Sequence, residues 1–127
     1  MEKQNIEEII RKKVEYEDSC PLGRLRRAGY LAFAYAINGR KDCLETMQQL
    51  KYIRTIPSES DAEAYFRHSN REKECRTKID YLYKIPSNQN DNLRYHEIRM
   101  LKKERDEASE HQEILINRIA QVGDFIY

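Results

Sequence analysis

Apolar residues recur every three or four positions in five separate stretches of the chain, a spacing that predicts five amphipathic helices. The first, at residues 3–17, carries Ile6, Ile9, Ile10 and Val14 on one side. No stretch shows the strict alternation of a half-buried strand, so we expect an all-α fold. The other four predicted helices span residues 23–38, 42–56, 60–84 and 93–122.

Two similar stretches, YIRTIPS at residues 52–58 and YLYKIPS at residues 81–87, follow this helical pattern. A residue before proline avoids the α conformation, so the third helix should end at Ile56 and the fourth ahead of Pro86. Ser58 or Ser60 is expected to cap the next helix, and Gly39 to end the second one in a left-handed turn. We therefore interpret the two stretches as helix ends and not as a structural repeat.

The two longest predicted helices have matching inner positions when the chain is folded back between them. Residues whose numbers sum to 180 then face each other, which predicts an antiparallel hairpin with coiled-coil-like packing. Together with a small three-helix head at residues 1–56, this hairpin at residues 57–127 makes up the expected architecture. The expected inner positions are Tyr65, His68, Glu72, Cys75, Ile79 and Leu82 on one helix and Ile98, Leu101, Arg105, Ala108, Gln112, Leu115, Ile119 and Val122 on the other.

This seam is apolar at both ends and polar in its middle, and polar seam positions lower the stability of a coiled coil. The hairpin therefore needs further apolar cover. We expect self-association, or binding of a partner helix, along the seam; the alternative is a monomer in which the head folds over the hairpin. The apolar positions expected to carry this contact are Tyr65, Ile79, Leu82, Ile98, Leu101, Leu115 and Ile119.

The charge of the chain gives only weak evidence about its partners. The 127 residues include 23 Lys and Arg against 22 Asp and Glu, so no global field attracts nucleic acid or anionic lipid. Residues 1–56 are mildly basic, with 11 basic and 8 acidic side chains, and their last two helices weakly resemble a helix-turn-helix. Nucleic-acid binding by this head is the alternative function, and its expected contacts are Arg11, Lys12, Lys13, Arg24, Arg26, Arg27, Arg40 and Lys41.

The patterns needed for enzyme chemistry are missing from the sequence. The stretch HEIRM at residues 96–100 starts like a zinc-protease motif but has Met100 where the second histidine belongs. His68 and Cys75 are about 10 Å apart along a helix, too far to share a zinc ion. With four glycines and no strand there is no phosphate-binding loop. We expect no catalytic residue, no metal, no cofactor and no small-molecule substrate.

Three cysteines without a CxxC motif favour reduced thiols, and the polar first residues are unlike a secretory signal. The longest apolar run, residues 30–37, is shorter than the roughly 20 residues that span a bilayer. We expect a cytoplasmic protein that binds no membrane. Its expected function is that of a non-catalytic helical protein-interaction module, such as an adaptor, an assembly factor or a small inhibitor of a larger protein.

Overall fold

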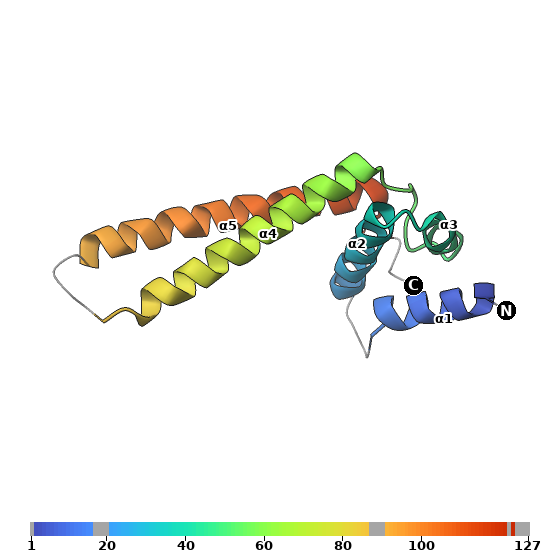
Figure 1. Cartoon of the computed structure of the whole chain (residues 1–127), viewed down its shortest axis with the longest axis horizontal. Helices are drawn as coiled ribbons and strands as arrows, with labels where there is room; N and C mark the ends of the chain where they lie inside the picture. Colours follow the sequence, from blue (N-terminus) through green and yellow to red (C-terminus); the bar gives the residue numbers. More distant parts are fainter. Residues whose placement is uncertain (1, 17–20, 87–90, 122, 124–127) are drawn as a thin grey trace. The chain divides into compact units, whose positions relative to one another are not determined.

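The computed structural model describes residues 2–16, 21–86, 91–121 and 123, and over these residues the chain forms five helices and no strand (Figure 1). The prediction of an all-α fold, with three short helices followed by a long helical hairpin, is confirmed. The helices are α1 at Glu2–Val14, α2 at Pro21–Ile37, α3 at Lys41–Gln49, α4 at Glu59–Lys84 and α5 at Asp91–Ile119.

The chain divides into two compact units, and the division differs from the predicted boundary at residues 56 and 57. The head unit comprises the residues up to Ala64 and those from Ile114 onward, and the hairpin unit comprises Tyr65–Glu113. The physical reason lies in the ends of the long helices. Ala62 at the start of α4, and Ile116 and Ile119 at the end of α5, are almost fully buried and belong to the head unit.

The head unit has a conventional apolar core, in which α1, α2 and α3 pack against one another. Gly29 on α2 lies so close to α5 that an added Cβ would come within 2.7 Å of Cγ1 of Ile116. Glycine at this position therefore permits the two helices to approach closely. The largest side chains with almost no exposed surface are Phe33, Ile10, Met47, Ile53 and Val14.

Two helices of the head end in left-handed residues. At the end of α2, Gly39 has φ of 68° and its backbone N–H donates to the Ala36 carbonyl, as the Asn-Gly sequence predicts. At the end of α3, Lys51 has φ of 64° and its N–H donates to the Gln48 carbonyl. The prediction that the third helix runs to Ile56 is therefore wrong, because this second left-handed stop ends it at Gln49.

The segment between α3 and α4 is held by burial and by backbone hydrogen bonds. Tyr52 and Ile53 are buried, and the N–H of Arg54 donates to the carbonyl of Ile119 over 2.6 Å. Burial, followed by the nearby carboxylate of Glu15, raises the pKa of Tyr52 to about 12. Ser58 then caps α4 as predicted, since its Oγ accepts from the N–H of Asp61 over 3.1 Å.

In the hairpin unit α4 and α5 lie side by side and antiparallel (Figure 1). Two contacts between them join residues whose numbers sum to 179, one less than predicted: His68 with His111, and Cys75 with Glu104. Leu82 and Leu101 are only half-buried, and Val122 lies outside the described residues. The buried side chains on the hairpin unit are Tyr65, Ser69, Cys75, Ile79, Ile98 and Ala108.

Candidate functional site

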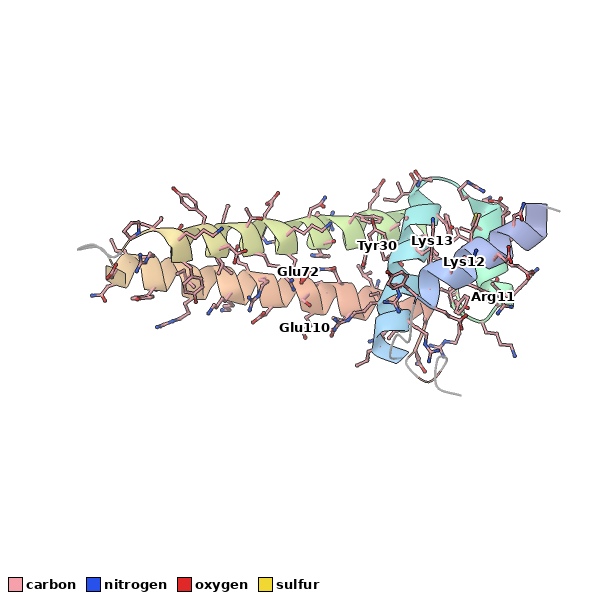
Figure 2. The ribbon with its side chains drawn as sticks, turned by 90° about the horizontal axis from the view of Figure 1, so that it is seen from below. Arg11, Lys12, Lys13, Tyr30, Glu72 and Glu110 are labelled. Atoms are coloured by element: carbon pink, nitrogen blue, oxygen red, sulfur yellow. The ribbon has the colours of Figure 1, made fainter. Side chains whose placement is uncertain are left out.

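The middle of the hairpin seam is joined by a polar bridge. Oε2 of Glu72 accepts from Nε2 of Gln112 over 2.9 Å, and Oε1 of the same carboxylate accepts from Nη2 of Arg76 over 2.9 Å. The Glu72 side chain is only 16% exposed and lies between α4 and α5 (Figure 2). The predicted partners were Ala108 for Glu72 and His68 for Gln112. The hydrogen bond instead joins Glu72 to Gln112, because a long polar side chain can reach past the residue opposite it to a hydrogen-bond partner.

Cys75 is buried next to a carboxylate. Its Sγ lies 3.7 Å from Oε2 of Glu104, and burial first, then this carboxylate, raises the pKa of the thiol. A thiol with a raised pKa is a poor nucleophile at neutral pH. The predicted contact of Cys75 with Arg105 is wrong, because the Arg105 guanidinium instead pairs with Asp106, with Nη2 and Oδ1 3.1 Å apart.

Two histidines, one from each helix, stack across the hairpin. The ring centroids of His68 and His111 are 4.6 Å apart and the rings are inclined by only 18°. The pKa of His68 is lowered, first by burial and then by the neighbouring charges of His111, Arg67 and Arg71. Its surroundings therefore favour the neutral form of the His68 imidazole.

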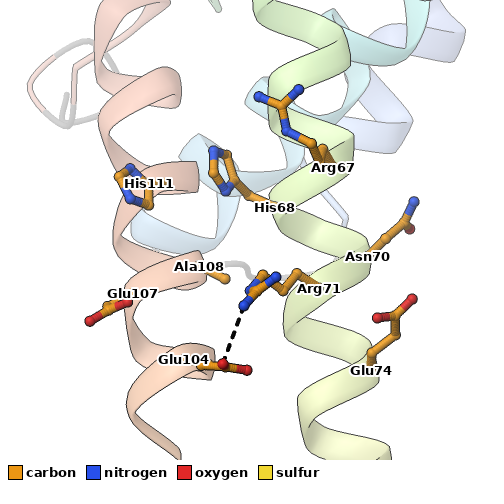
Figure 3. A pocket seen from close by; sticks show the side chains of 9 residues that line it. All are labelled: Arg67, His68, Asn70, Arg71, Glu74, Glu104, Glu107, Ala108 and His111. Atoms are coloured by element: carbon orange, nitrogen blue, oxygen red, sulfur yellow. Dashed lines mark ion pairs between the residues drawn. The ribbon is translucent and has the colours of Figure 1, made fainter. Parts of the chain in front are cut away.

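The stacked histidines lie in an open groove of about 560 Å³ on one face of the hairpin (Figure 3). Both arginines of its lining come from α4, and two of its three carboxylates come from α5. One ion pair crosses the groove, between Nη2 of Arg71 and Oε1 of Glu104 over 3.2 Å. The groove is lined by Arg67, His68, Asn70, Arg71, Glu74, Glu104, Glu107, Ala108 and His111.

Next to the predicted loop of the hairpin, Arg94 ties the two helices together. Its Nη1 donates to the carbonyl of Ile85 over 2.6 Å, and its Nη2 pairs with Oδ1 of Asp91 over 3.1 Å. Sequence reasoning missed this role, although the unpaired carbonyls at the end of a helix are a general reason to expect a nearby cation.

The same end of the hairpin unit exposes large apolar side chains. We call residues 78–86 and 91–103 the hairpin tip. Two of its tyrosines lie near cations, with Lys102 5.4 Å from the centroid of Tyr83 and Arg94 5.3 Å from that of Tyr95. The exposed fractions are Tyr81 66%, Tyr83 55%, Leu93 69%, Tyr95 52% and Met100 48%.

The predicted basic contacts of the head have different environments. Arg11, Lys12 and Lys13 are exposed and project from the last turn of α1 (Figure 2). In contrast, Arg27 is half-buried and its Nε donates to the carbonyl of Val14 over 2.9 Å, and Arg40 forms an ion pair with Asp42 over 3.1 Å. The remaining predicted contacts are Arg24, which is half-buried, and Arg26 and Lys41, which are exposed.

These features define an all-α protein with a helical hairpin. Searches against protein-family models, curated proteins and solved structures found no match for this chain. Within the part of the chain that the structure describes, no group of three or more His, Cys, Asp or Glu side chains is arranged to hold a metal ion. Nor does any described helix combine the length and apolar character needed to cross a bilayer.

Proposed function

We propose that this protein is a non-catalytic helical interaction module that binds other protein chains, including copies of itself, through its hairpin. The observation that carries the proposal is the group of exposed apolar side chains at the hairpin tip. Leu93 is 69% and Met100 48% exposed, so neither side chain adds much to the burial that holds the hairpin together. Apolar surface of this type, gathered at one end of a helical unit, marks protein-binding sites.

The composition of the tip supports a protein partner. Tyrosines contribute contact area at low conformational cost and are enriched in protein interfaces, as are methionine and arginine. Tyr83 and Tyr95 are each held beside a cation, which limits the freedom that would be lost on binding. The seam adds a further reason, because its polar middle gives the hairpin less apolar cohesion than a continuous coiled coil has.

The test replaces Leu93 and Met100 together by serine. Both side chains are exposed, so the fold and the melting temperature should change little. Sedimentation velocity over a concentration series should show self-association of the original protein and its loss in the variant. Protein partners co-isolated with the original chain should likewise be lost.

A matched control is Ile9→Ser on α1, because Ile9 is also 48% exposed but lies on the head. This variant should associate like the original protein. The proposal is overturned if the original chain is monomeric at every concentration and its co-isolated proteins are the same with and without the tip substitutions.

A second candidate function is nucleic-acid binding by the head. The observation that favours it is the exposure of three consecutive cations, Arg11, Lys12 and Lys13. Cations in the last turn of a helix are also favoured by the helix dipole, which gives them a purely structural reason to be there. Retention on heparin that falls steeply with salt would support this candidate, and binding that is insensitive to salt would support the protein interface.

A further inference from the structure

The outer surface of the hairpin carries a second heptad pattern on the side of the groove. On α4, residues 67, 71, 74, 78 and 81 follow alternating spacings of four and three, and residue 85, directly after the helix, continues the spacing. On α5, residues 93, 97, 100, 104, 107 and 111 do the same. Such a spacing keeps side chains along one stripe of a helix. Three residues of each stripe line the same groove, so both stripes border one face of the hairpin (Figure 3). We call this the groove face.

The two stripes of the groove face have opposite charge. The α4 stripe holds three cations and one carboxylate, whereas the α5 stripe holds three carboxylates and neither lysine nor arginine. All of these charged side chains are exposed except Glu104, which is half-buried. The charged residues are Arg67, Arg71, Glu74 and Lys78 on α4 and Glu97, Glu104 and Glu107 on α5.

The apolar residues of the groove face gather at its tip end. Tyr81 ends the α4 stripe, Ile85 follows directly after the helix, and Leu93 and Met100 belong to the α5 stripe. Three of these four are about half exposed or more: Tyr81, Leu93 and Met100. The face thus has an apolar end and a charged end, which is the composition of a surface that binds another helical surface in one register.

This pattern is self-complementary under one kind of twofold symmetry. If a second copy is related by an axis parallel to the hairpin, each α4 stripe faces the α5 stripe of the other copy at the same height. Residues whose numbers sum to 178 are then opposite each other, which brings Arg71 to Glu107 of the second copy. In the same register Lys78 faces Met100 and Tyr81 faces Glu97, so the complementarity lies in the net charge of the two stripes and in their shared apolar end. A twofold axis across the hairpin would instead place each basic stripe against its own copy, which is repulsive.

From this complementarity we infer that the groove face is the site of self-association, and that two copies pair there as a parallel four-helix assembly. The inference rests on the proposed function and deepens it by naming the surface through which two copies of this chain pair. One like-charged contact remains in this arrangement, because Glu74 meets Glu104 of the second copy, and it is flanked by Arg71 and Lys78. The apolar residues at the tip end supply the burial that exposed ion pairs alone do not.

Two exposed charged residues of the hairpin outside the groove face provide controls. Lys73 on α4 and Glu110 on α5 lie outside both stripes and are exposed. Lys73 is two residues from Arg71 along α4, and Glu110 is three residues from Glu107 along α5. They therefore serve as charge-reversal controls outside the groove face.

The decisive experiment uses two charge-reversal variants, Arg71→Glu and Glu107→Arg, alone and mixed. Each variant alone places like charges against each other twice in the symmetric pair, which should weaken self-association about tenfold. In the equal mixture, the glutamate introduced at position 71 of one chain meets the arginine introduced at position 107 of the other. The unchanged residues at positions 107 and 71 meet at the symmetric contact. Association in the mixture should therefore return to within about twofold of the original protein.

Mixing changes no contact within a chain, so recovery can come only from contacts between chains. Fluorescence-detected sedimentation of one labelled variant against the other unlabelled variant measures it directly, and circular dichroism checks that each variant is folded. The control variants Lys73→Glu and Glu110→Lys should associate like the original protein, alone and mixed.

Three results would overturn the inference. If the original chain is monomeric, self-association itself fails, and the proposed function then depends on other protein partners. If the original chain associates but the mixture of the groove-face variants is as weak as either alone, the copies pair through another surface. If the control variants weaken self-association and the groove-face variants do not, the interface lies outside the groove face.

Discussion

The head and the hairpin are both built from α-helices but are stabilised in different ways. In the head, Phe33, Met47 and Ile53 are almost completely buried. In the hairpin, the middle of the seam holds the Glu72–Gln112 hydrogen bond, the Cys75–Glu104 contact and the stacked histidines. Apolar burial is therefore continuous in the head and interrupted in the hairpin.

This difference suits the head to providing stability and the hairpin to binding another chain. A closely packed apolar core fixes a single arrangement and leaves little surface for a partner. A seam with polar positions specifies register at the expense of stability, and it leaves apolar side chains such as Leu93 and Met100 on the outside. The hairpin is accordingly the part of the molecule in which binding of another chain would add most to stability.

The largest effect is expected in the head, from Phe33→Ala. Removing a fully buried phenylalanine leaves a cavity and should lower the free energy of unfolding by about 3–5 kcal/mol. Ile79→Ala in the hairpin should cost about 2 kcal/mol, the low end for its type, because the half-buried seam around it can relax. Hydrogen exchange resolved by segment would measure both units in each variant. Equal losses from the two substitutions would contradict the comparison.

A smaller change in stability, an increase instead of a loss, is expected from the double substitution Glu72→Leu and Gln112→Leu. Replacing both partners of a partly buried polar bridge by apolar residues removes their desolvation and extends the apolar seam. The hairpin should become more stable by about 1 kcal/mol. Gln112→Leu alone should be less favourable than the pair, since it leaves the Glu72 carboxylate without its partner on α5. Chemical denaturation of the original protein and the two variants, read in the hairpin segments, would show whether the polar bridge lowers the stability of the hairpin.

The helices themselves could be predicted from the sequence because their apolar spacing and several of their ends are local signals. The Asn-Gly stop at Gly39 and the Ser58 cap are examples in which the residue type determines the backbone. The end of α3 could not be predicted, because Lys51 is a residue that rarely adopts a positive φ and nothing local distinguishes it. Its conformation is held by tertiary contacts, including burial of the adjacent Tyr52 and Ile53.

The candidate site was harder to predict than the fold for a related reason. Pairing residues by number placed the helices within one residue of the observed register, which is sufficient for apolar side chains of similar size. It failed for polar side chains, whose partners depend on reach and direction: His68 stacks on His111 and Cys75 contacts Glu104, and both of these partners lie one position from the predicted seam. The groove face was not predicted, because its residues lie outside the apolar stripe from which the hairpin was inferred.

The smallest expected effect is a loss of hairpin stability in mild acid, caused by His68. Its pKa in the folded chain is lowered below the ordinary value of 6.5, chiefly by burial and then by His111 and two arginines. The unfolded chain therefore binds the proton more tightly, so this contribution is fully present above pH 6.5 and is lost as the pH falls through the folded pKa. Because His68 is only half-buried and solvent screens its neighbours, the loss should be well below the ~1.4 kcal/mol that a full pKa unit represents.

Denaturation midpoints at pH 7.5 and about pH 5 would measure this loss. The substitution His68→Asn should reduce the difference between the two midpoints. The control is His96→Asn, which replaces an exposed histidine on α5 and should leave the difference unchanged. If the original protein and the His68 variant lose the same stability over this range, the stacked pair does not make the hairpin sensitive to pH, and the polar seam differs from the apolar core of the head only in strength.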